Sequence, residues 1–293
     1  MRRLLIGGKG YVGSALKAYL KPFVDVVDWN SGGMDYDTYK AFKGFDAIIL
    51  LAGNSSVASC NDFYDTWNQN VVKFTNLLTR IGDTRLIYVS SASVYGGRYS
   101  PYLCCEDDRI QDPMNYYDWS KQMVENTAKM SGKRNLVGLR FGTVCGSSPN
   151  PRMDVIFNAM MLSAKSTGVI KESNPFSLRG VLGMKDLCRG IERVLEVPEA
   201  SGIYNMSSFN TKICEVSGAV ADYFPGTTID PQKSDGNAYS FALSTDKFER
   251  TFDFAFKQTP GDIIEDLDKN VDWDKVMKNP ELYKRGPRNV AKN

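Results

Sequence analysis

The feature that most constrains the fold is a glycine-rich loop near the start of the chain. The apolar run Leu4-Leu5-Ile6 is typical of a buried strand, and residues 11–20 carry apolar side chains at helical spacing. The loop between them, Gly7 to Gly13, fits both G-x-x-G-x-x-G and G-x-G-x-x-G. Glycines let the backbone come close to a pyrophosphate, which then lies on the helix N-terminus. We therefore expect a dinucleotide on Gly7, Gly10, Tyr11, Val12 and Gly13.

An acidic residue follows this loop at the distance that dinucleotide-binding units require. Asp28 ends the next expected strand, 20 residues after Gly8. A carboxylate there accepts hydrogen bonds from the adenosine ribose and repels a 2′-phosphate, so we predict NAD as the cofactor. Asp35 is a candidate contact for the adenine, and a role as an ordinary turn residue is its equal alternative.

Strands and helices alternate over the first half of the chain. Further strands are expected over 45–51, 85–90 and 136–141, with helices over 65–80 and 117–130. This alternation predicts an α/β protein with a Rossmann-type, doubly wound parallel sheet. After residue 146 the elements become short and mixed, which favours a smaller C-terminal substrate-binding lobe. We expect residues 1–146 to form the NAD-binding domain, 180–206 to return to it, and 147–179 with 207–293 to form the lobe.

The composition excludes several classes of function. The chain has no histidine, which excludes Ser-His-Asp hydrolysis, Cys-His nucleophiles and His-ligated zinc, so we expect no metal. With 36 basic and 34 acidic residues there is no electrostatic case for nucleic acid. The apolar run at the start of the sequence is too short for a signal peptide and no run approaches about 18 apolar residues, so we expect neither a signal peptide nor a membrane span. A cytoplasmic protein with reduced cysteines and no membrane partner is expected.

Two further motifs place reactive side chains near the expected cofactor. Tyr117 and Lys121 form a Y-x-x-x-K pattern, and residues four apart share one face of a helix. A neighbouring ammonium and an oxidised nicotinamide both favour the phenolate of a tyrosine, so we expect the pKa of Tyr117 to be lowered. The segment from Ser90 to Gly96 follows a strand, at the sheet edge where such folds bind ligands.

These elements, in this order, resemble the extended short-chain dehydrogenase/reductases, in their branch of nucleotide-sugar epimerases and dehydratases. The resemblance covers nearly the whole chain. It is carried by GGKGYVGS, LAGNSSV, NVVKFTNLL, VSSASVYG, YYDWSK, LRFGTVCGSSPNPR, LRGVLGMKD and GIYNMSS.

The resemblance implies a role for particular residues. Ser91 corresponds to the catalytic serine, Tyr117 to the acid/base and Lys121 to its partner on the nicotinamide ribose. Leu51, Ala52 and Gly53 occupy a cofactor-binding stretch of the family. Asn158 corresponds to an amide that contacts the sugar nucleotide, Thr143 takes the place of a substrate-site asparagine, and Arg179 corresponds to the arginine that clamps the diphosphate.

Departures from the family pattern narrow the expected reaction. The 4,6-dehydratases carry an Asp-Glu pair where this chain has Ala92 and Ser93, so we do not expect dehydration. Relatives that invert a centre beside a ketone use a histidine that is missing here. We expect an NAD-dependent epimerase acting at C4 of a nucleotide-diphosphate sugar. The alternatives are an NAD(P)H-dependent 4-keto-sugar nucleotide reductase and a non-catalytic dinucleotide-binding protein.

The resemblance also implies a homodimer formed by the helices over 65–80 and 117–130. A helix that packs on its own sheet and on a partner needs two apolar faces. The first helix has one stripe with Trp67, Val71, Phe74 and Leu78, and further apolar residues, Val72 and Leu77, lie off that stripe. A monomer in which a loop covers the second face is the alternative.

Overall fold

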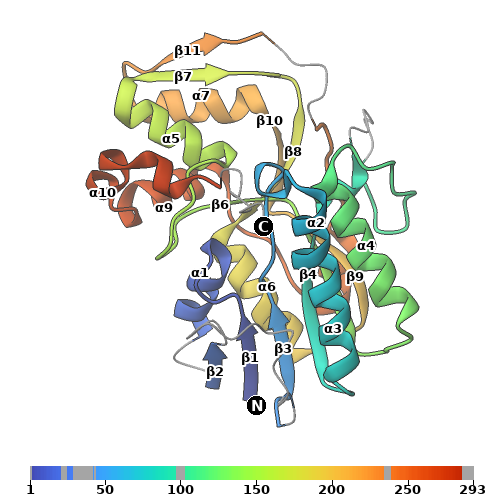
Figure 1. Ribbon diagram of the computed structural model, residues 1–293. Helices are drawn as coiled ribbons and strands as arrows, with labels where there is room; N and C mark the ends of the chain where they lie inside the picture. The colour runs from blue at the N-terminus through green and yellow to red at the C-terminus, as the bar shows by residue number, and fades with distance from the viewer. Residues whose placement is uncertain are drawn as a thin grey trace.

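The chain is built around a six-stranded parallel sheet, which the computed structural model shows with helices on both faces (Figure 1). The structure describes residues 2–20, 25–28, 42, 44–96, 103–233 and 239–285. The strands lie in the order β2-β1-β3-β4-β5-β9, and every neighbouring pair is parallel. Their bounds are β1 (Arg2–Ile6), β2 (Asp25–Asp28), β3 (Ala47–Leu50), β4 (Arg85–Ser91), β5 (Leu136–Phe141) and β9 (Gly202–Met206). The predicted Rossmann-type sheet is confirmed.

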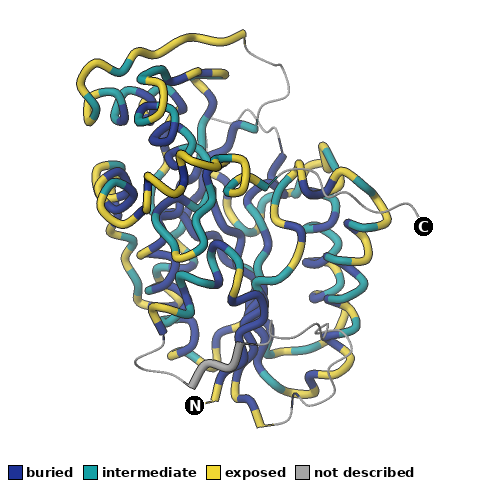
Figure 2. Tube along the Cα trace, turned by 60° about the vertical axis from the view of Figure 1, so that its left-hand side comes forward, coloured by how far each residue is buried: buried dark blue, intermediate teal, exposed yellow. Residues whose placement is uncertain are grey.

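The strands are largely apolar because both faces of the sheet are covered. Successive side chains of a strand point to opposite faces. In β1, Leu5 belongs to the core under α1 (Tyr11–Leu20) and α6 (Met184–Glu196), whereas Leu4 and Ile6 belong to the core on the other face. A sheet buried on both sides has no polar face, which explains the continuous apolar runs in the sequence. Figure 2 shows a buried, dark blue interior in this part of the molecule.

The second face is covered by α4 (Tyr116–Met130) and by one long helical rod. The rod runs through α2 (Phe63–Thr66), the π-helical segment η2 (Trp67–Val72) and α3 (Lys73–Arg80). The side chains of the rod and of α4 in this core are Phe74, Leu77, Leu78, Val124 and Ala128. Both helices predicted on this face are therefore present, and the π-helical turn is a feature that the sequence pattern did not indicate.

A second group of elements forms a lobe beyond the carboxyl edge of the sheet (Figure 1). It contains two small sheets, with orders β10-β8-β6 and β11-β7. Their strands are β6 (Thr143–Cys145), β7 (Val169–Glu172), β8 (Leu178–Gly183), β10 (Phe209–Lys212) and β11 (Thr228–Pro231). The helices of the lobe are α5 (Ile156–Thr167), α7 (Ile213–Tyr223), α9 (Pro260–Asn270) and α10 (Trp273–Lys278), and they enclose an apolar core of their own.

The chain passes between the two parts more than once. After β8 it returns to the first part through α6 and β9, and β9 pairs with β5 at the edge of the large sheet. The helix α8 (Asp246–Phe252) also packs on this side, with Phe252 lying 4.9 Å from Tyr204 of β9 between ring centroids. We had expected the stretch that contains α8 to belong to the lobe.

Candidate active site

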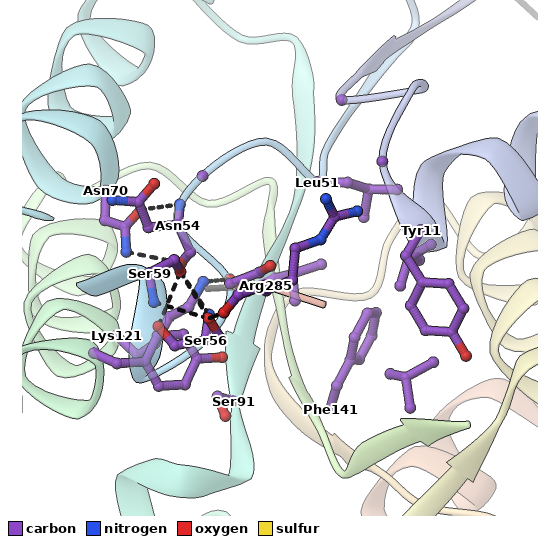
Figure 3. A pocket seen from close by; sticks show the side chains of 18 of the residues that line it. Tyr11, Leu51, Asn54, Ser56, Ser59, Asn70, Ser91, Lys121, Phe141 and Arg285 are labelled. Carbon is purple, nitrogen blue, oxygen red and sulfur yellow. Dashed lines mark hydrogen bonds between the residues drawn. The ribbon is translucent and has the colours of Figure 1, made fainter. Parts of the chain in front are cut away.

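A large cavity lies at the carboxyl edge of the sheet, where the loops that follow β1, β3, β4 and β5 converge. Its volume is about 1120 Å³, and side chains from the lobe line its far wall. Figure 3 shows Ser91 and Lys121 on one side of the cavity, with Tyr11 and Phe141 across from them. Parallel α/β sheets bind their ligands at this edge, so the cavity is the candidate active site.

The glycine loop is packed so tightly that only glycine fits at two of its positions. Gly7 has φ +100°, and a Cβ added to it would lie 2.7 Å from the backbone nitrogen of Ala52. A Cβ on Gly13 would lie 2.0 Å from the carbonyl oxygen of Gly7. The loop therefore packs directly on the chain after β3 and leaves the first turn of α1 facing the cavity. This cradle fits a dinucleotide pyrophosphate.

The other residues predicted to bind the cofactor surround this cradle. Those that line the cavity are Gly7, Gly10, Tyr11, Val12, Gly13, Leu51, Ala52 and Gly53. Asp28 ends β2 and stands opposite Leu5 in the strand register, which puts it at the edge where the glycine loop begins. Asp35 lies outside the described residues.

The three predicted catalytic residues all line the same cavity. Ser91 ends β4 and accepts a hydrogen bond from the Ser93 amide at 3.1 Å, beginning the short helix η3 (Ala92–Tyr95). Tyr117 and Lys121 lie one turn apart on α4, whose first turn is capped by the Asn115 side chain accepting from the Asp118 amide at 3.1 Å. The Lys121 Nζ is 5.6 Å from the centre of the Tyr117 ring.

The electrostatics of Tyr117 differ from the sequence-based expectation. Burial raises the pKa of the Tyr117 phenol, while a hydrogen bond with Ser91 and the positive charge of Arg152 lower it. Lys121 was expected to supply that charge. Its Nζ instead donates to the Val89 carbonyl at 3.1 Å, and burial lowers its own pKa to about 8. In this arrangement Ser91 and Arg152 favour the phenolate, and Lys121 can lose its charge at mildly alkaline pH.

Arg179 lies on β8 in the wall contributed by the lobe. Its guanidinium donates to the Leu178 carbonyl at 2.9 Å and to the Tyr239 carbonyl. Burial lowers its pKa, and no carboxylate of the described residues forms an ion pair with it. A half-buried cation without an acidic partner is costly unless an anion binds to it. Thr143 lies in the same cavity, at the start of β6.

Asn158 is not brought to the cavity. Its side chain is fully buried on α5 and has a different task from the predicted sugar-nucleotide contact. The amide oxygen accepts from the Gly146 amide at 3.2 Å, and the amide nitrogen donates to the carbonyls of Gly146 and Arg152 at 3.1 and 2.9 Å. It also donates to the Tyr11 hydroxyl at 3.3 Å. Asn158 therefore ties the loop after β6 to the glycine-loop helix, a structural role.

Several residues in the cavity wall were not singled out from the sequence. They include Asn70, Arg152, Tyr239 and Arg285. Asn70 lies in the π-helical segment and holds the loop after β3, accepting from the Asn54 amide at 2.7 Å and donating to the Asn54 carbonyl at 3.1 Å. It also donates to Ser120 at 2.9 Å, which connects that loop to α4. Asn70 begins the segment NVVKFTNLL, which carries part of the family resemblance, but its hydrogen-bond partners Asn54 and Ser120 are distant from it in the sequence.

Other kinds of site find no support in the described part of the chain. No group of three or more Cys, Asp or Glu side chains there could hold a metal ion, and all six cysteines are free thiols. Among the helices that the structure describes, none has the length and apolarity needed to cross a membrane.

The fold and this site define a class, the Rossmann-type enzymes that use a bound dinucleotide. Residues 3–207 match the model of the NAD dependent epimerase/dehydratase family. The chain belongs to this family, and its cofactor is NAD. One relative is the ADP-L-glycero-D-manno-heptose-6-epimerase of Brachyspira hyodysenteriae, 26% identical over 225 residues, which cover 71% of this chain and 69% of the relative.

Solved structures share the whole fold at low identity. RMD from Pseudomonas aeruginosa, complexed with NADPH, superposes with a TM-score of 0.80 at 21% identity, covering 94% of this chain and 99% of that one. The UDP-glucuronic acid 4-epimerase of Bacillus cereus, in complex with UDP-glucuronic acid and NAD, gives 0.79 at 19% identity, with coverage of 95% and 99%. At these identities the similarity demonstrates the fold.

Proposed function

We propose that the protein is an NAD-dependent epimerase that inverts C4 of a hexose on a nucleotide diphosphate through a transient 4-keto sugar. One observation carries the proposal: Ser91, Tyr117 and Lys121 line one cavity with both the glycine cradle and the half-buried Arg179. The cradle suits the dinucleotide, and Arg179 suits the diphosphate of the substrate. Solved structures with this fold contain UDP-sugars together with NAD.

In the proposed reaction, the protein's own side chains transfer one proton to and from O4 of the sugar. When bound on the glycine cradle, NAD would supply reversible hydride transfer at the sugar carbon. Tyr117 accepts the O4 proton as the ketone forms and gives it back when the ketone is reduced. Ser91 hydrogen-bonds O4 and, with the Arg152 charge, stabilises the phenolate. Inversion requires the keto-sugar to turn over between the two transfers, and a cavity of about 1120 Å³ offers the space.

The described part of the cavity wall lacks the additional acid and base that a dehydratase would need beside Tyr117. Expelling water from C5 and C6 needs a further acid and base beside Tyr117. The residues after Ser91 are Ala92 and Ser93, both buried, and neither can act as a carboxylic acid. Asp154 is the only acidic residue among the described residues of the cavity wall, and it is paired with Arg152 at 2.6 Å.

A 4-keto-sugar nucleotide reductase is the second candidate. The structure of RMD is complexed with NADPH, and it superposes with the same TM-score, 0.80, as a UDP-glucuronic acid 4-epimerase structure, so the fold is compatible with both candidates. Thr143 also lies in the cavity at the position where the resemblance implies an asparagine in epimerases. A non-catalytic dinucleotide-binding protein has less support, because such a protein would not need Ser91, Tyr117 and Lys121 around one cavity.

Product analysis without added nicotinamide cofactor separates these candidates. The purified protein is incubated with a panel of nucleotide-diphosphate hexoses deuterated at C4, and products are identified by NMR and mass spectrometry. An epimerase inverts C4 and retains the deuterium, because the hydride never leaves the site. Inversion at another carbon would refute the C4 assignment alone. If the protein converts none of these sugars but oxidises NAD(P)H when given 4-keto sugars, the proposed function changes from epimerase to reductase.

We also propose a homodimer formed by the rod and α4. The exposed ends of these helices carry an aromatic cluster in which Phe63 contacts the rings of Tyr64, Tyr116 and Trp119 at centroid distances of 5.1 to 5.6 Å. Tyr64 is 79% exposed. Aromatic side chains gathered on an exposed helical face are typical of an interface, and a twofold contact would pair the cluster with itself.

A further inference from the structure

The last described residues of the chain lie in the wall of the active-site cavity. The short helix η4 (Pro280–Tyr283) ends beside the lobe, and Lys284 and Arg285 then line the cavity. Figure 3 shows Arg285 among the residues of this wall, in this view between Ser56 and Leu51. Ser56 belongs to the loop that follows β3, whose first residues pack on the glycine cradle. Arg285 therefore comes from the end of the chain to the cofactor side of the cavity.

Three hydrogen bonds fix this segment from both sides. The Met153 amide donates to the Tyr283 carbonyl at 2.7 Å, and the Arg285 amide donates to Oδ2 of Asp154 at 3.0 Å. The Ser56 hydroxyl donates to the Arg285 carbonyl at 3.3 Å. The lobe thus holds one side of the Arg285 backbone and the loop after β3 holds the other. These contacts with residues distant in the sequence fix the backbone of Arg285 at one position in the wall.

The charge of the cavity indicates what the arginine would bind. The described residues of the wall include seven basic side chains and a single acidic one, Asp154. Asp154 is already engaged by the Arg152 guanidinium at 2.6 Å and by the Arg285 amide. An excess of cations in a concave site attracts an anion, and a guanidinium binds a phosphate with two parallel hydrogen bonds.

We propose that Arg285 is a binding residue for the diphosphate of a nucleotide in this cavity, supplied by the C-terminal end of the chain. Two ligands carry this group: NAD, and the nucleotide sugar of the proposed function. The NAD measurement stands without that proposed function, and only the nucleotide-sugar measurement depends on it. Because Ser56 belongs to the loop after β3, whose first residues pack on the glycine cradle, we expect NAD to be the ligand.

Affinity measurements on single variants test the proposal. The dissociation constants for NAD and for UDP are measured separately by calorimetry on stripped wild type, R285M, R285K and R179M. K278M is the matched control, because Lys278 lies at the exposed end of α10. R285M should weaken NAD about tenfold or more, the range for a lost hydrogen bond to a charged group. R285K should lose less, and the difference from wild type should shrink as salt is added. R179M should weaken UDP.

The outcomes separate the two ligands and a merely structural role. If R285M weakens UDP instead of NAD, the diphosphate is that of the substrate. If both constants stay within twofold of wild type while the melting temperature is unchanged, the proposal is overturned. The same holds if K278M weakens binding as much as R285M does.

A double-mutant cycle then tests the anchoring by Ser56. S56A removes the donor to the Arg285 carbonyl, so it should weaken the same ligand about threefold in wild type and have no further effect in R285M. Equal effects in both backgrounds would mean that Ser56 does not act through Arg285, which would refute the anchoring.

Discussion

The Tyr239 hydroxyl lies 2.8 Å from both carboxylate oxygens of Asp118, the residue directly after Tyr117. Asn115, which caps the first turn of α4, donates to the same hydroxyl at 2.6 Å. The Tyr239 carbonyl in turn accepts from Arg179. Tyr239 therefore contacts the start of the helix that carries Tyr117 through its hydroxyl, and the facing Arg179 through its backbone carbonyl.

Removing this connection should destabilise the protein and weaken substrate binding together. Tyr239→Phe leaves the fully buried Asp118 carboxylate without one charged hydrogen bond, and such bonds contribute about 1.5–3 kcal/mol. We expect a loss of that order in the free energy of unfolding, measured in urea, and a raised KM with a smaller change in kcat. Tyr116→Phe, on the exposed side of α4, is the control. Unaltered stability and KM in the Tyr239 variant would contradict this role.

Tyr117→Phe should abolish turnover while NAD stays bound. The ring still packs, but no group remains to accept the proton, and acid/base groups typically contribute 10²–10⁴-fold. The rate is measured with the substrate found by product analysis, and bound NAD is measured after acid release. The neighbouring Tyr116→Phe again serves as the control. More than about a tenth of wild-type activity in Tyr117→Phe would rule out the assigned role.

Lys121 should leave a pH signature in stability. Its pKa in the folded protein is about 8, below the ordinary value of 10.5, because burial disfavours the charged ammonium. Above about pH 10.5 the Lys121 amine is neutral in both the folded and the unfolded protein, so its burial carries no charge penalty. As the pH falls from 10.5 through 8, the buried amine has to become charged and the free energy of unfolding decreases. Lys121→Met escapes this penalty, so it should unfold at higher urea than wild type at pH 7. The difference should narrow between pH 8 and 10. A difference independent of pH would show that Lys121 is not desolvated.

The dimer should dissociate when charge enters the aromatic cluster. Tyr64→Glu places a carboxylate at the centre of the proposed contact, where it would lose its hydration on association. Sedimentation equilibrium at micromolar concentration should give twice the chain mass of 32.7 kDa for wild type and the single mass for the variant. A wild-type protein that sediments at 32.7 kDa would rule out the dimer.

Local patterns predicted those parts of the site that depend on neighbouring residues. The glycine cradle and the Tyr117–Lys121 pair each lie within one turn or loop, so their residue spacing is visible in the sequence, and the elements around them support the assignment. The role expected of Ser91 came from the family resemblance, and Ser91 lies at the end of β4 in the cavity wall. The sheet was predictable for a similar reason, since burial on both faces requires continuous apolar runs.

The remaining parts depend on contacts that no local pattern reveals. Arg285 is held in the cavity wall by a hydrogen bond from Ser56 to its carbonyl, and the two residues are 229 positions apart in the sequence. Asn158 has the residue type expected for a substrate contact, but the backbone around Gly146 uses its amide. Leu77 was offered as part of a second, outward apolar face of the rod and is fully buried in the sheet core instead. The outward apolar residues lie nearer the start of the rod, around Tyr64 and Trp67.

The way in which the chain crosses between the sheet and the lobe limits how substrate preference could be redesigned. The apolar core of the lobe interleaves two stretches of sequence, with Phe157 and Met161 from the first and Val216 and Ile264 from the second. A chimera that takes only the second stretch from a relative would set foreign side chains against a native half-core, and mismatched packing costs several kcal/mol. Grafting a new lobe therefore requires both stretches from the same donor, joined on either side of a retained α6 and β9.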